Sequence, residues 1–187
     1  MISRILLSLL ISLFTGSTFI TQAVAQQRDH LTAQEVDLVK EAQALDKRID
    51  VFIKAAERRI LVINGSATAA TNTKQLKKDS ERWGELPTGS RAELVSDIAK
   101  ILDEAITNID DVSSRDERNP LIGKSLRKLA QTVNTMMAQL KPLAAEAKSE
   151  SEVASFELLN EDAQSIIEAA NKLPPEVVVD KKTKKSN

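Results

Sequence analysis

Apolar residues recur at alternating spacings of four and three through the first helical segment. The stripe is Leu38, Ala42, Leu45, Ile49, Phe52, Ala56 and Ile60. This spacing is typical of an amphipathic helix that packs as in a coiled coil. Thr32 and Glu35 form a capping-box pattern before it, and Asn64-Gly65 is a stop signal after it. The pattern predicts one long helix over 33–63.

Three further segments repeat the same periodicity, over 91–114, 120–148 and 152–173. Ser90 and Glu93 form a second capping box, and Asn119-Pro120 supplies an N-cap followed by proline at the first helical position. Pro142 should kink the 120–148 helix near its end. Because the connections near 115–119 and 148–152 are short, we expect these helices to run antiparallel in chain order.

The connection between the first two long helices contains the only tryptophan. A short helix over 74–83 would place Leu76 and Trp83 on one face, with Gly84 as its stop. We expect the Trp83 ring, helped by Leu76 and Leu86, to anchor this connection onto the bundle. The alternative is that Trp83 contacts a ligand or partner.

These patterns predict an all-α protein, a bundle of four long amphipathic helices plus one short helix. The bundle would occupy 26–173, with 174–187 as a disordered, lysine-rich tail. Residues 1–25 read as a signal peptide: Arg4, a short apolar run, and an Ala-Val-Ala site cut after Ala25. An uncleaved anchor is the alternative. We therefore expect a periplasmic or secreted protein.

Composition narrows the available chemistry. The chain has no cysteine, no tyrosine and one histidine, His30, which precedes the first helix where we expect a frayed terminus. A histidine-rich or thiolate metal centre is excluded, and Met136 and Met137 fit a core better than a haem ligand set. We expect no cofactor and no metal. The formal net charge is −1 for the whole chain; without Arg4 and the +2 tail of 174–187, the body over 26–173 is −4, and a mildly acidic body argues against nucleic-acid binding.

Carboxylates are the remaining candidates for catalysis. Asp103, Glu104, Asp110 and Asp111 lie in the acidic segment 103–117, and the spacing of seven puts Asp103 with Asp110 and Glu104 with Asp111 on shared faces. A solvated acidic face is the simpler interpretation. The alternative is a carboxylate-based enzyme or a calcium-dependent protein, which would need acidic groups from two helices in a cleft.

Basic residues gather on the first helix. Lys54, Arg58 and Arg59 are expected to be ordinary surface charges there, with Lys74, Lys77 and Lys78 near them in sequence. The alternative is a patch that attracts an anionic partner.

Three stretches resemble a group of uncharacterised exported bacterial helical proteins. They are "DLVKEAQALDKRIDVFIKAAERR", "ERWGELPTGSRAELVSDIAKILDEAITNIDD" and "NPLIGKSLRKLA". The resemblance implies a helical fold and export, and it carries no activity or site. The function we expect is an exported, non-enzymatic interaction module of the cell envelope, binding another envelope protein or itself as a homodimer. Contact with a membrane would be peripheral at most.

Overall fold

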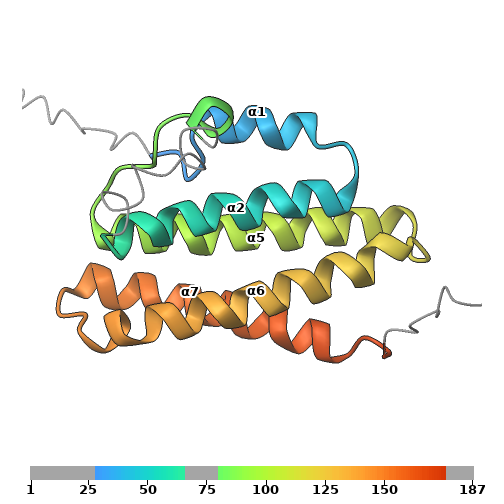
Figure 1. Ribbon diagram of the computed structural model, residues 1–187. Helices are drawn as coiled ribbons and strands as arrows, with labels where there is room; N and C mark the ends of the chain where they lie inside the picture. The colour runs from blue at the N-terminus through green and yellow to red at the C-terminus, as the bar shows by residue number, and fades with distance from the viewer. Residues whose placement is uncertain (1–27, 66–79, 176–187) are drawn as a thin grey trace, which may run out of the picture.

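The computed structural model describes residues 28–65 and 80–175, and it confirms an all-α bundle (Figure 1). Its helices are α1 (Ala33–Glu41), α2 (Leu45–Ile63), α5 (Arg91–Arg115), α6 (Pro120–Ala145) and α7 (Glu150–Asn171). Ser80–Trp83 are also helical. The four long helices are those that the apolar stripes predict, with the first one shortened.

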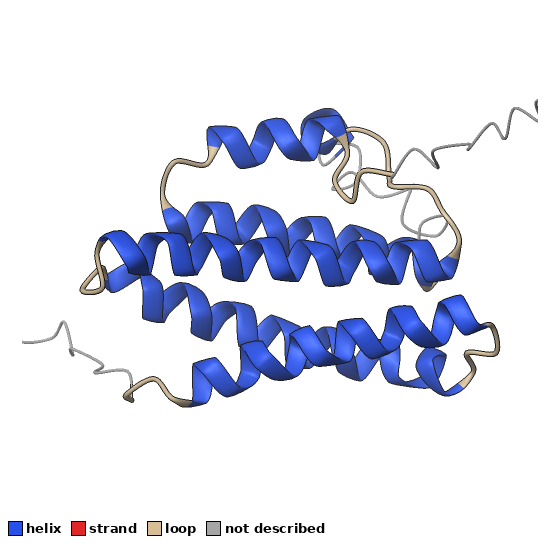
Figure 2. Ribbon diagram, turned by 180° about the vertical axis from the view of Figure 1, so that it is seen from behind, coloured by secondary structure: helices blue, strands red, loops and turns tan. Residues whose placement is uncertain are grey.

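The helices form two layers and a cover. Helices α2 and α5 make one layer, α6 and α7 make the other, and α1 lies on the outer side of α2 (Figures 1 and 2). Chain direction alternates through α2, α5, α6 and α7 (Figure 1). Helix α5 packs mainly against α2 and α7, so its chain neighbour α6 lies diagonally across the bundle. The neighbouring helices α5 and α7 therefore run parallel.

The core between the layers is almost wholly aliphatic. Its members sit at the stripe positions of each helix and include Ile49, Phe52, Ile98, Ile101, Leu102, Leu129, Val133, Met136, Leu140, Phe156, Leu159 and Ile166, all buried. Lys124 and Lys128 of α6 pair with Asp46 and Asp50 of α2 at 2.9 and 2.6 Å. Apolar burial supplies the main driving force, and these exposed pairs add little to it.

The expected continuous helix over 33–63 is wrong. The chain leaves helical geometry at Ala42–Ala44, and α1 folds back along α2 (Figure 1). No glycine or proline marks the break, and alanine favours helix, so local propensity gives no warning of it. Arg48 Nε donates to the Ala42 carbonyl at 3.1 Å and closes the turn. Tertiary contacts of α1 therefore decide this break.

The position of α1 follows from the two buried faces of α2. One face, with Ile49 and Phe52, points into the bundle, while Val51 and Arg58 lie on the adjoining face that α1 covers. Leu38 of α1 packs against Val51. The first stripe thus merges two separate surfaces: Leu38 belongs to the α1 contact, and the positions from Leu45 onward belong to the bundle core.

Caps begin the helices where the sequence indicates. The capping boxes of Thr32 with Glu35 and of Ser90 with Glu93 are both present. Asn119 accepts from the Leu121 backbone N at 3.0 Å, with Pro120 as the first helical residue. Helix α6 ends at Ala145 rather than 148, so Pro142 sits in its last turn.

Several expectations fall outside the described residues. The signal peptide, the lysine-rich tail, Leu76 with most of the short helix, and Lys74, Lys77 and Lys78 lie in 1–27, 66–79 or 176–187. Gly84 is described and has the left-handed φ of +68° expected of a helix stop. In the two described stretches, no helix has the length and apolar character needed to cross a bilayer.

Candidate functional site

A buried ion network holds α1 to α2, and Glu35 is its centre. The Glu35 side chain is fully buried. Its carboxylate accepts from Arg59 Nη1 and Nη2 at 2.8 Å each, from Arg58 Nε at 3.1 Å and from the Thr32 backbone N at 2.9 Å. The expectation that Arg58 and Arg59 are surface charges is therefore wrong: they are 5% and 1% exposed.

The same arginines bind the two chain segments that cross α2. Arg59 Nη2 donates to the His30 carbonyl, and Arg58 Nη2 donates to the carbonyls of Gly84 and Glu85. A guanidinium offers five donors in a rigid plane, which suits several backbone acceptors at once. Both arginines are engaged with protein groups, so this network serves the structure rather than an anionic partner.

Residues 28–32, just before α1, make defined contacts with α5, which corrects the expected frayed terminus at His30. His30 Nε2 lies 2.8 Å from Glu104 Oε2 of α5. Arg28 donates to Asp97 Oδ2 at 2.7 Å, and Arg59 Nε lies 3.9 Å from the same oxygen. Burial raises the pKa of Asp97, and the nearby positive charges of Arg28 and Arg59 oppose that rise. These contacts fix the segment onto α5.

Trp83 lies in a small cluster separate from the main core. Its ring is 8% exposed and packs with Leu38 of α1 and Val51 of α2. The Arg58 guanidinium lies 5.8 Å from the ring centroid, a cation–π distance. Leu86 is half-buried. The burial favours the anchor interpretation, with α1 and the outer face of α2 as the surface that Trp83 holds.

The acidic residues of α5 do not converge. Asp103, Asp110 and Asp111 are exposed, and Asp111 pairs with Arg115 one turn along the same helix. Glu104 faces His30 instead. Within the described stretches no group of three or more acidic, histidine or cysteine side chains could hold a metal ion. The four residues therefore form no joint site with one another.

Asp162 of α7 is a titratable group that the sequence reasoning missed. Burial, followed by the negative charges of Asp103 and Glu161, raises its pKa to about 6. The sequence shows Asp103 and Asp162 only as acidic positions on separate helices. It does not show that α5 and α7 are neighbours, so the raised pKa could not be predicted. Neither Asp103 nor Asp162 lines any of the three grooves described below.

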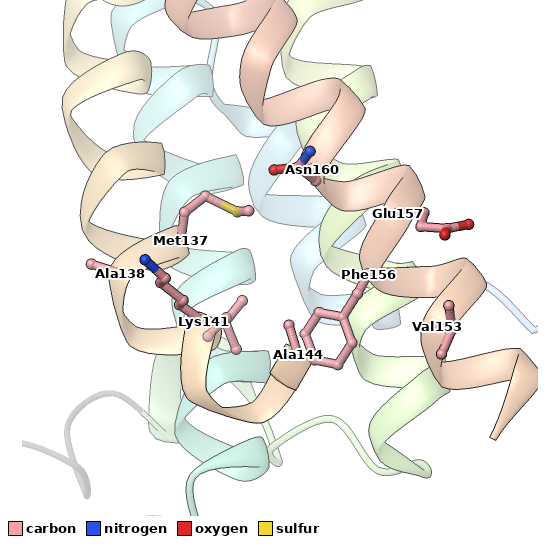
Figure 3. A pocket seen from close by; sticks show the side chains of 9 residues that line it. Met137, Ala138, Lys141, Ala144, Val153, Phe156, Glu157 and Asn160 are labelled. Carbon is pink, nitrogen blue, oxygen red and sulfur yellow. The ribbon is translucent and has the colours of Figure 1, made fainter. Parts of the chain in front are cut away.

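Of the three grooves described for this chain, the most apolar lies between α6 and α7. It encloses about 540 Å³. Its walls combine the C-terminal half of α6 with the N-terminal half of α7, and its lining is Met137, Ala138, Leu140, Lys141, Ala144, Val153, Phe156, Glu157 and Asn160 (Figure 3). The Phe156 ring is 8% exposed and points towards Ala144, while Met137 reaches across towards α7.

Few polar groups border this groove, and Figure 3 shows where they point. Lys141 borders the groove on α6, with its ammonium group pointing back over α6 and away from α7, and Asn160 borders it on α7. The Glu157 carboxylate points away from α6. Val153 is 40% exposed, one of two large apolar side chains with that much exposure in the described ranges; the other is Leu158 at 43%, which does not line the groove.

Two other hollows are more polar. A groove of about 270 Å³ between α2 and α6 is lined partly by Glu57, Asn64 and Gln139. A groove of about 490 Å³ beside Trp83 includes Glu41, Lys47, Asp50 and Arg82. Ligand pockets are usually apolar with a small number of polar groups. The α6–α7 groove fits that description best.

Comparison of the chain with protein-family models, with curated proteins and with solved structures found no match. The function is therefore argued from the geometry of the molecule itself.

Proposed function

We propose that this protein is an exported, non-enzymatic binding module that makes its contact through the α6–α7 groove. The observation that carries the proposal is the lining of that groove. Phe156, Met137 and Val153 give an apolar surface, and Lys141 and Asn160 supply polar groups at its edge. This combination provides binding area and orientation, which is what a binding site needs.

The non-enzymatic part rests on how the titratable groups are used. Glu35 and Asp97 pair with arginines, and Glu104 faces His30. Catalytic acids and bases need a pocket beside them in which a substrate can sit. Asp162, whose pKa is raised to about 6, lines none of the three grooves. These arrangements favour binding over catalysis.

The exported part rests on residues 1–25 and their Ala-Val-Ala site. The sequence contains no cysteine, so the fold depends on no disulfide bond. The protein can therefore fold in an oxidising compartment as well as in a reducing one. The large aliphatic core makes the bundle stable without disulfides.

Site-specific photo-crosslinking tests the proposal. A photoreactive phenylalanine analogue replaces Val153 in the groove or Leu158 outside it, in cells that make the protein. The two positions share a helix and are 40% and 43% exposed, so they are matched in accessibility. We expect crosslinked products from Val153 in the exported fraction and none from Leu158. Equal crosslinking at both positions, or none at either, would contradict a contact site in the groove.

A further inference from the structure

We propose that the α6–α7 groove binds a long-chain fatty-acid carboxylate, taken up as a single molecule from water, with Lys141 beside its head group. This inference rests on the proposed function, since it names the ligand of the same groove. Size, lining and charge each support it.

The size of the groove suits a small ligand. Small-molecule sites enclose about 300–1,000 Å³, and this groove encloses about 540 Å³. A stable interface with a second copy of the chain would need about 800 Å² from each partner. In the described ranges Val153 and Leu158 are the large apolar side chains that stand out most, and Leu158 lies outside the groove. The exposed apolar surface is thus small for a protein interface.

The lining suits an alkyl chain. Met137, Ala144, Val153 and Phe156 present carbon and sulfur atoms along the line where two helices meet. Methionine is flexible and polarizable, so Met137 can adjust to a chain of variable shape. Each methylene moved from water into such a surface contributes about 0.8 kcal/mol. An elongated apolar ligand gains the most from this site.

The charge at the edge selects an anionic head group. Lys141 is exposed and borders the groove on α6. Within the described stretches Lys141 forms no ion pair, and the Glu157 carboxylate of the opposite wall points away from α6. A carboxylate at the α6 edge of the groove would meet the charge of Lys141, while its chain lies against Phe156.

Displacement of a fluorescent fatty acid tests the inference. The protein is purified from the cells that export it and is mixed with cis-parinarate, which becomes fluorescent in apolar sites. Dodecanoate or dodecyltrimethylammonium then competes, each below its micelle-forming concentration. We expect saturable binding of one parinarate per chain and displacement by dodecanoate at lower concentration than by the cation.

Three variants make the test specific. Val153→Asp places a charge in the apolar groove and should weaken dodecanoate binding about tenfold or more. Leu158→Asp is the matched control and should change it less than about twofold. Lys141→Glu should weaken dodecanoate binding about fivefold or more and leave the cationic competitor unweakened. Circular dichroism melts of all three check that the fold is intact.

The possible outcomes distinguish an error in the proposed ligand from an error in the proposed binding site. Absence of saturable parinarate binding, or equal losses in Val153→Asp and Leu158→Asp, would overturn the inference. An unchanged dodecanoate affinity in Lys141→Glu would overturn the assignment of the head group. Binding to anionic phospholipid vesicles without binding to monomeric dodecanoate would point to a membrane surface instead. Crosslinking at Val153 to a protein, without fatty-acid binding, would leave the proposed function standing and refute only this ligand.

Discussion

Replacing Glu35 with glutamine tests how α1 is held. The substitution keeps the shape of the side chain and removes its charge, while Arg58 and Arg59 stay protonated and buried. Removing one partner of a buried ion pair typically costs about 3–5 kcal/mol. Because Asp97 Oδ2 lies 3.9 Å from Arg59 Nε and still offers it a negative charge, we expect the lower end, about 3 kcal/mol.

Two probes show where this free energy is lost. Trp83 packs with Leu38 of α1, so its fluorescence reports whether α1 is docked, while far-ultraviolet circular dichroism reports the whole bundle. Helix α1 packs on α2, and the four long helices have a core of their own. In urea, Glu35→Gln should therefore lose the native Trp83 signal well before it loses most of its helix.

A control and a refuting result complete the test. Glu41 lies on the same helix and is exposed, so Glu41→Gln should stay within about 0.5 kcal/mol of the wild type. If Glu35→Gln unfolds in one transition within about 1 kcal/mol of the wild type, then the buried network does not hold α1, and the explanation for the break at 42–44 fails.

Three further predictions concern other parts of the chain. Trp83→Ala should cost about 3 kcal/mol or more because the ring is buried against Leu38 and Val51, and limited proteolysis should then cut near 80–90; wild-type resistance would contradict the anchor role. Asp162 holds its proton more tightly in the folded state, so its contribution to stability is present below about pH 4 and is lost as the pH rises through about 6. Asp162→Asn should therefore be more stable than the wild type at pH 7.5, by about 1 kcal/mol after allowance for solvent screening, and no more stable at pH 4; urea unfolding at both pH values decides this. Mass spectrometry of the exported protein should find Gln26 as its first residue, and an intact N-terminus would support the anchor alternative.

The fold could be predicted largely because apolar periodicity and capping act locally. The capping boxes at Thr32 and Ser90 and the core positions from Leu45 onward follow from spacings within one turn or two. The break at 42–44 could not be predicted. It depends on Glu35 meeting Arg58 and Arg59, more than twenty residues away, and Ala42-Gln43-Ala44 carries no stop signal.

The candidate site likewise combines features that follow from local sequence with features that depend on tertiary packing. The apolar spacing of the last helix predicts that Phe156 is buried, which is confirmed, yet no sequence pattern says that the α6–α7 contact leaves a groove at that end. The acidic segment was visible in sequence, but its side chains proved to be spread between solvent, Arg115 and His30. Tertiary packing determines which helices are neighbours. The neighbouring helix in turn determines whether a side chain lines a groove, pairs with another residue or faces solvent.

Backbone amide NMR of the exported protein during a titration with dodecanoate tests the central claim most directly. If the α6–α7 groove is the binding site, the shifts should concentrate in the C-terminal half of α6 and the N-terminal half of α7, around Met137, Lys141, Val153 and Phe156. The chemical shifts of amides near Trp83 and along α5 should not change during the titration. Shifts centred on Trp83, or no saturable shifts at all, would contradict it.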